Sequence, residues 1–169
     1  PETQAAVELV DKAIASITAK VNALGLPVNY IFLSDHGMAA VDTVTRINIS
    51  SMIDTAGFII RGGNTSLHLY AKNNADIQST YESLKKKEKK CTVSLLEFIP
   101  AQRHYTKTDG LFNRIVDIFV VPTFPFLFSS YTNRIAPGTH GFDPAMIKMH
   151  SSFYAWGPQI KKRKNNRFF

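Results

Sequence analysis

The sequence predicts an α/β chain made of a helix–strand unit and a smaller α+β unit. Apolar residues recur at spacings of three and four along residues 2–24, which is typical of one face of an amphipathic helix. Gly25 and Pro27 then break the chain, and an apolar run of strand length follows at residues 29–33. Farther along, residues 58–121 follow the pattern strand, strand, helix, strand, strand. A long helix joined by a short break to a strand is the unit from which layered α/β domains are built.

The composition is that of a globular domain. Of 169 residues, 44% are hydrophobic and 20% are charged, which allows a sizeable core and argues against a disordered chain. The net charge is +7, and five positive charges fall within the last nine residues: Lys161, Lys162, Arg163, Lys164 and Arg167. We expect residues 159–169 to be a solvated basic tail rather than a specific nucleic-acid surface, with non-specific anion binding left open. No apolar run reaches the length of a membrane span, and the single cysteine, Cys91, excludes an intrachain disulfide.

The long helix is expected to bury its apolar face, and the strand at residues 29–33 is expected to be buried as well. The residues that share the helix face are Val7, Val10, Ile14, Ile17, Val21 and Leu24. Gly25 ends the helix.

The smaller unit is predicted as an insertion at about residues 57–121, beside the main sheet. A turn at 61–64 joins strands 58–60 and 66–71 into a hairpin, and Asp76 caps a helix that ends in the lysine run 85–90. Strands at 92–98 and 115–121 complete it. The aromatic-rich stretch 123–137 is predicted either to line a pocket or to form a buried connection.

The strand at 29–33 leads directly into Ser34-Asp35-His36-Gly37-Met38. Asp35 offers a hard oxygen ligand and His36 a nitrogen ligand at the carboxyl end of a strand, where ligands bind in open α/β sheets. Gly37 allows the backbone to turn away at once. Taken alone, the same residues also describe a strand followed by a polar turn.

A second candidate ligand lies in Gly138-Thr139-His140-Gly141-Phe142-Asp143-Pro144. Glycines on both sides of His140 let the backbone bend close to whatever the ring touches, and Asp143 is expected to cap a short helical turn. A loop histidine without a metal role is the alternative. Two glycine-bracketed histidine loops beside α/β strands together favour a metal site. Of the other histidines, His68 is predicted to be solvated and His150 to support the site or the core. His104 is predicted either to make a structural hydrogen bond or to face a substrate.

These motifs resemble the type I phosphodiesterases and nucleotide pyrophosphatases of the alkaline phosphatase superfamily. The matching residues are 33–38, 138–144 and Met149-His150, followed by Phe153, Ala155 and Gly157-Pro158 at their usual spacing. Weaker support comes from Ile99-Pro100 and Arg103-His104-Tyr105. The resemblance covers residues 1–158 and corresponds to the C-terminal portion of the family's catalytic domain.

The resemblance implies a three-layer α/β/α fold with a mixed, largely parallel sheet, present here in part, and a site for two divalent metal ions, most readily Zn²⁺. Asp35 and His36 would bind one ion and His140 the other. A metal-activated threonine would attack a phosphodiester and form a phosphoryl-enzyme that water hydrolyses, while the two cations offset the developing charge.

The family's threonine nucleophile and its remaining metal ligands have no counterpart in these residues, so we expect them upstream of Pro1 and expect the chain alone to be inactive. Its partners would be a nucleotide or another small phosphodiester and the N-terminal part of the same domain. By resemblance the location would be secreted, periplasmic or at the cell surface. Two alternatives remain open: a phosphomonoesterase of the same superfamily, and a non-catalytic fragment that acts as a binding or interaction module.

Overall fold

The computed structural model describes residues 2–48, 51, 53–73, 75–87, 89–103, 116–129 and 134–161. The chain divides into two compact units. The terminal unit comprises Pro1–Asp35 and Ser151–Phe169, and the central unit comprises His36–His150. Within the described residues, no helix is both long enough and apolar enough to cross a membrane.

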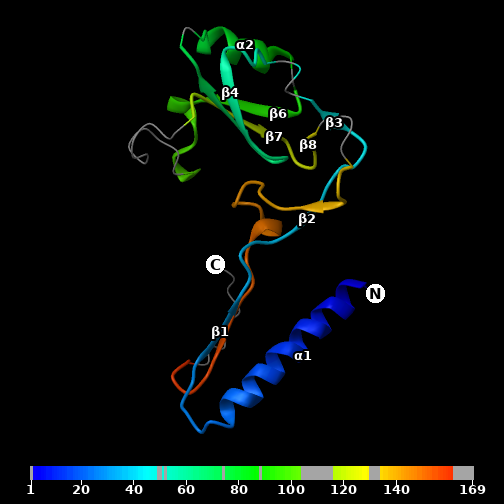
Figure 1. Cartoon of the computed structure of the whole chain (residues 1–169), viewed down its shortest axis with the longest axis vertical. Coiled ribbons are helices and arrows are strands. Elements are labelled where there is room, and N and C mark those ends of the chain that lie inside the picture. The colour runs from blue at the N-terminus through cyan, green and yellow to red at the C-terminus, as the bar shows by residue number, and fades with distance from the viewer. Residues whose placement is uncertain are drawn as a thin grey trace. The chain divides into compact units, whose positions relative to one another are not determined.

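The terminal unit contains one helix and a two-stranded ribbon (Figure 1). Helix α1 spans Glu2–Asn22, with an acidic residue in its first turn and Lys20 in its last, as the helix dipole favours. Gly25 follows with a φ of 69°, which a glycine adopts without strain. Strand β1 (Tyr30–Leu33) pairs antiparallel with β10 (Phe153–Trp156). The ring of Tyr30 stacks on that of Trp156, and its hydroxyl donates a hydrogen bond to Asn22.

The expected burial of the helix face and of the first strand is wrong for this unit. Helix α1 contains no buried residue, and side chains on its apolar face, such as Ile17, remain 62% exposed. Strand β1 alternates between half-buried and exposed residues, with Ile31 exposed by 62%. The periodic pattern is present, but one helix and a two-stranded ribbon supply no second layer to cover it.

The core of the central unit is a four-stranded antiparallel sheet with the order β4-β5-β7-β6. Its strands are β4 (Phe58–Gly62), β5 (Leu67–Ala71), β6 (Cys91–Leu95) and β7 (Ile118–Pro122). Helix α2 (Ile77–Lys87) packs against one face, where Leu84 is fully buried among the sheet's apolar residues (Figure 1). The predicted hairpin is confirmed by the β4–β5 pairing, and the predicted cap by the hydrogen bond from the Ser79 amide to Asp76 Oδ1.

Side chains alternate across β5 as predicted, but the prediction that His68 is solvated is wrong. Leu67 and Leu69 face the core beneath α2. His68 lies half-buried on the opposite face, its ring edge directed at Phe119 with 5.0 Å between ring centroids. The predicted strand 92–98 ends at Leu95 and continues as a 3-10 turn, Leu96–Phe98, followed by a second such turn at Ala101–Arg103.

Two short strand pairs complete the central unit. Strand β2 (Ala39–Ala40) pairs antiparallel with β9 (Gly138–Thr139), and β3 (Arg46–Ile47) pairs parallel with β8 (Leu127–Phe128). A 3-10 turn, Ile147–Met149, precedes the return to the terminal unit. Pairing is thus mixed, but among the described strands β3–β8 is the one parallel pair, so parallel pairing does not predominate here. Hairpin geometry accounts for the antiparallel β4–β5 pair, whereas β1–β10, β2–β9 and β5–β7 are antiparallel pairs of strands that are not consecutive in the chain.

Candidate functional site

The structure brings His36 and His140 into contact within the central unit. Strand β2 begins three residues after His36, and β9 ends directly before His140. Antiparallel pairing of Ala39 with Thr139 therefore places the start of one strand beside the end of the other. The two imidazole rings stack face to face, with 3.6 Å between centroids and an interplanar angle of 13°.

The backbone beside His36 is fixed by a close approach of the segment around Lys148. The amide of Gly37 donates a hydrogen bond to the carbonyl oxygen of Met149 (3.0 Å). A Cβ atom at residue 37 would collide with the carbonyl oxygen of Lys148. Glycine is therefore required at this position, and it determines where His36 lies.

The loop that carries His140 is anchored on its other side. Gly141 has a φ of +89°, and a Cβ atom there would lie 2.5 Å from the Thr65 hydroxyl oxygen. Phe142 is buried in a small apolar cluster that includes Met149. Asp143 Oδ1 accepts a hydrogen bond from the Ala145 amide (2.9 Å). The predicted helix cap is wrong, because the 3-10 turn Ile147–Met149 begins after Met146 and has no side-chain cap.

A hydrogen bond to the backbone defines the protonation of His36. Its Nδ1 lies 2.8 Å from the carbonyl oxygen of Gly37. Because a carbonyl oxygen can only accept, Nδ1 carries the proton, and the lone pair of the neutral ring is on Nε2. Histidines that bind metals through one nitrogen usually donate the other N–H to a carbonyl or a carboxylate. This tautomer of His36 would suit a metal ligand that binds through Nε2.

The two histidines fit part of a two-metal site. Nearly parallel stacked rings do not direct their nitrogens at one point, so they suit two ions, which in such sites lie about 3.5–4 Å apart. Imidazole nitrogen suits zinc among divalent ions. Within the described ranges, however, no group of three or more His, Cys, Asp or Glu side chains is placed to hold a metal. The rings thus supply two ligands, and a complete site needs further ones.

Asp35 directly precedes His36 and belongs to the terminal unit, where its backbone carbonyl accepts a hydrogen bond from the Ser151 hydroxyl (3.1 Å). His150 is exposed, so the core role considered for it is wrong. His104 and the basic residues after 161 fall outside the described residues.

Sequence reasoning missed the ion pair between Arg103 and Asp143. The Arg103 Nη2 atom lies 2.8 Å from Asp143 Oδ2. Arg103 belongs to a weak motif and Asp143 caps a turn, but 40 positions separate them. No local pattern connects residues so distant in sequence.

This is an α/β chain in which two histidine loops meet at the ends of paired strands. Glycine follows His36 and lies on both sides of His140. The chain belongs to the type I phosphodiesterase / nucleotide pyrophosphatase family, whose model matches residues 1–143.

Curated relatives and solved structures agree with this membership. The chain is 29% identical over 155 residues to mouse bis(5'-adenosyl)-triphosphatase enpp4, covering 90% of this chain and 33% of that protein. The structure of human ectonucleotide pyrophosphatase/phosphodiesterase 5 matches with a TM-score of 0.82 and 24% identity, over 94% of this chain and 42% of that one. An inactive form of mouse ectonucleotide pyrophosphatase/phosphodiesterase 5 in complex with AMP matches with a TM-score of 0.65 and 26% identity, over 76% of this chain and 33% of that one.

These matches confirm the expected alkaline phosphatase-type α/β fold, present in part. The chain spans 33% of the length of the mouse triphosphatase.

Proposed function

We propose that the whole protein containing these 169 residues is a divalent-metal-dependent hydrolase of phosphodiester or pyrophosphate bonds. Family membership supports the reaction class. The observation that carries the proposal is the contact between His36 and His140, whose rings stack 3.6 Å apart although 104 positions separate them in the sequence. That contact supports the proposal, because a site for two ions needs nitrogen donors that lie close together.

The proposed ligand set is Asp35 and His36 for one ion and His140 for the other, with Zn²⁺ as the metal. The tautomer of His36 supports its role, because Nε2 has the lone pair. Asp35 is proposed as a ligand because it directly precedes His36 and because its carboxylate offers a hard oxygen. When bound, such ions polarise the phosphoryl oxygens and favour the deprotonated nucleophile.

We propose a nucleotide, or a similar small phosphodiester, as the substrate. The name of the mouse enpp4 relative specifies a bis(5'-adenosyl) triphosphate substrate, and the inactive mouse ectonucleotide pyrophosphatase/phosphodiesterase 5 is in complex with AMP. Both compounds contain a phosphate joined to a nucleoside, which is the shared chemistry that the proposal extends to this chain.

We also propose that the 169 residues alone do not turn over substrate. They contain no counterpart of the family's threonine nucleophile and only part of the ligand set that the resemblance implies. The rest of the catalytic domain is proposed to pack on the exposed apolar faces of α1 and β1, since within the described strands β1 pairs with β10 alone. A stable α/β domain covers such faces with further layers.

The test is hydrolysis of bis(p-nitrophenyl) phosphate and of thymidine 5'-p-nitrophenyl phosphate by the whole protein. We expect activity that is lost on chelation with EDTA and restored by Zn²⁺. Faster hydrolysis of the monoester p-nitrophenyl phosphate would favour a phosphomonoesterase instead. Absence of metal-dependent turnover on all three compounds would contradict the proposal and favour a non-catalytic binding module.

A further inference from the structure

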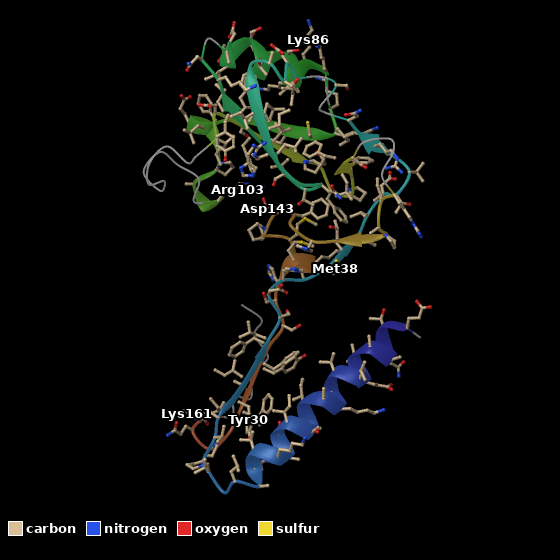
Figure 2. The ribbon with its side chains drawn as sticks, in the orientation of Figure 1. Tyr30, Met38, Lys86, Arg103, Asp143 and Lys161 are labelled. Carbon is tan, nitrogen blue, oxygen red and sulfur yellow. The ribbon has the colours of Figure 1, made fainter. Side chains whose placement is uncertain are left out.

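Arg103 and Asp143 connect two parts of the central unit. Their side chains lie beside one another (Figure 2), with a hydrogen-bonded ion pair of 2.8 Å between Arg103 Nη2 and Asp143 Oδ2. The Arg103 side chain is 20% exposed and that of Asp143 is 44% exposed. The pair is therefore partly shielded from solvent on the arginine side.

Arg103 is held on the face of the sheet opposite α2. Its guanidinium carbon lies 5.6 Å from the centroid of the Phe119 ring, a cation–π contact. Phe119 is on β7 and is buried in a cluster with Ile99 and Val116. The Arg103 amide also donates a hydrogen bond to the carbonyl oxygen of Pro100 (2.9 Å). These contacts thus hold Arg103 against the sheet.

Asp143 is held at the end of the loop that carries His140. One of its carboxylate oxygens accepts from the Ala145 amide and the other from Arg103. Three residues earlier, His140 stacks on His36, and between them Gly141 lies against Thr65 in the turn between β4 and β5. A displacement of Asp143 would therefore be transmitted to His140 through a short and constrained segment.

We propose that Arg103 and Asp143 are positioning residues for His140. Their ion pair ties loop 138–143 to the four-stranded sheet and holds the His140 ring face to face with His36. The hydrogen bonds, ion pair and cation–π contact described for these two side chains are to each other, to the Ala145 amide and to Phe119, so we propose that both act on the imidazoles through the loop. The consequence for metal binding and catalysis rests on the proposed function, whereas the consequence for ring geometry does not.

The proposal predicts a large change at the histidines with a small change in stability. A partly exposed ion pair contributes little to folding, because solvent screens it and ordering two side chains costs entropy. Groups that orient metal ligands without touching the metal nevertheless change metal affinity about 10–100-fold when they are removed. A merely structural role would instead reduce stability and leave the ring contact unchanged in the folded fraction.

The experiment uses three variants and one matched control. Arg103→Ala removes the guanidinium, Arg103→Lys keeps its charge without the planar fork, and Asp143→Asn removes the carboxylate charge while keeping an Oδ1 acceptor for the Ala145 amide. The control is Arg61→Ala, because Arg61 is an exposed residue of the same sheet that donates a hydrogen bond to the carbonyl of its neighbour, Ile60.

The first readout is the NMR chemical shift of the ring Hε1 protons of His36 and His140 in the metal-free 169-residue chain, since stacked rings shift one another's protons. We expect Arg103→Ala and Asp143→Asn to move both signals toward the values of an unstacked histidine, with a thermal midpoint close to that of the unaltered chain. Arg103→Lys should fall in between, and Arg61→Ala should match the unaltered chain.

The second readout is Co²⁺ affinity of the whole protein, measured by its visible absorption, which we expect to fall about tenfold in Arg103→Ala and Asp143→Asn. Unchanged histidine shifts in both variants would overturn the positioning role, whatever the metal result. If the variants lose the stack while the unaltered whole protein binds no Co²⁺, the positioning role is supported and the proposed metal-dependent function is the part that fails.

Discussion

At the residue scale, two glycines determine how the histidine loops are built. Gly37 lies against the Lys148 carbonyl and Gly141 against Thr65, and a Cβ atom at either position would collide with these neighbours. At Gly138 a Cβ atom would have only ordinary contacts, the nearest at 3.6 Å. The sequence thus indicated which residues bend the chain, but not the segments that they approach, because those contacts are made by residues distant in sequence.

Gly37→Ala is predicted to destabilise the central unit by about 1–3 kcal/mol, since the added methyl group would displace a backbone carbonyl rather than a flexible side chain. Gly63→Ala is the control, because an added methyl group there would meet open space and its φ is not in the left-handed region. We expect the control to stay within about 0.5 kcal/mol of the unaltered chain in urea unfolding. Equal losses in the two variants would contradict the close approach.

The pKa of His68 is lowered by burial from its ordinary value of 6.5. The unfolded chain therefore binds a proton before the folded chain does as the pH falls. The stability associated with neutral His68 is present above pH 6.5 and is lost as the pH falls from there toward the lowered pKa.

This pH dependence is tested with His68→Asn, which does not titrate. In urea unfolding, the midpoint of the unaltered chain should fall relative to that of the variant between about pH 7.5 and about pH 5.5. A difference between the two midpoints that stays constant over that range would show that His68 keeps its ordinary pKa in the fold.

At the element scale, local patterns predicted elements well and long-range pairings poorly. Helix α2, its Asp76 cap and the β4–β5 hairpin follow from signals within a few residues. The pairing of β1 with β10 joins opposite ends of the chain, and β2 with β9 joins residues about a hundred positions apart. Short strands with few residues carry too little pattern to specify such partners.

Leu84→Ala is predicted to cost about 2–5 kcal/mol, because Leu84 is fully buried between α2 and the sheet and its removal leaves a cavity. Ile59→Ala on β4 is the control, since Ile59 is 41% exposed on the same sheet. Urea unfolding followed by far-ultraviolet circular dichroism measures both. A loss for Ile59→Ala as large as that for Leu84→Ala would contradict the placement of the core beneath α2.

At the scale of the whole molecule, the terminal unit exposes faces that the sequence marks as interior. The helical period of α1 and the apolar run of β1 predicted burial, and the structure of this chain leaves Ile17 and Ile31 exposed. The apolar patterns of α1 and β1 show that these sequences suit buried faces. Whether the faces are buried depends on which other layers of secondary structure pack against them. That difference is the physical basis for proposing that further chain covers these faces.

Ile31→Ser is predicted to change the stability of the 169-residue chain by less than about 0.5 kcal/mol, because the side chain is already 62% exposed. In the whole protein, where we propose that the residue is covered, the same substitution should cost about 2 kcal/mol or more. Comparison of urea unfolding in the two contexts measures the difference. Equal, small effects in both would contradict a covered face.

The candidate site was predicted in part. His36 and His140 were identified from residue type and flanking glycines, and the structure brings their rings together. The Arg103–Asp143 pair, which joins the loop to the sheet, was not predicted, because each residue has an adequate local explanation. Ligand roles for Asp35, His36 and His140 stay a prediction until metal is measured.

The most direct test of the central claim is the zinc content of the whole protein, measured by mass spectrometry of the purified, dialysed protein. We predict two zinc ions per chain, about one in His36→Ala and about one in His140→Ala, and two in the control His150→Ala, whose histidine is exposed and outside the proposed ligand set. Two zinc ions retained in both His36→Ala and His140→Ala would contradict the central claim.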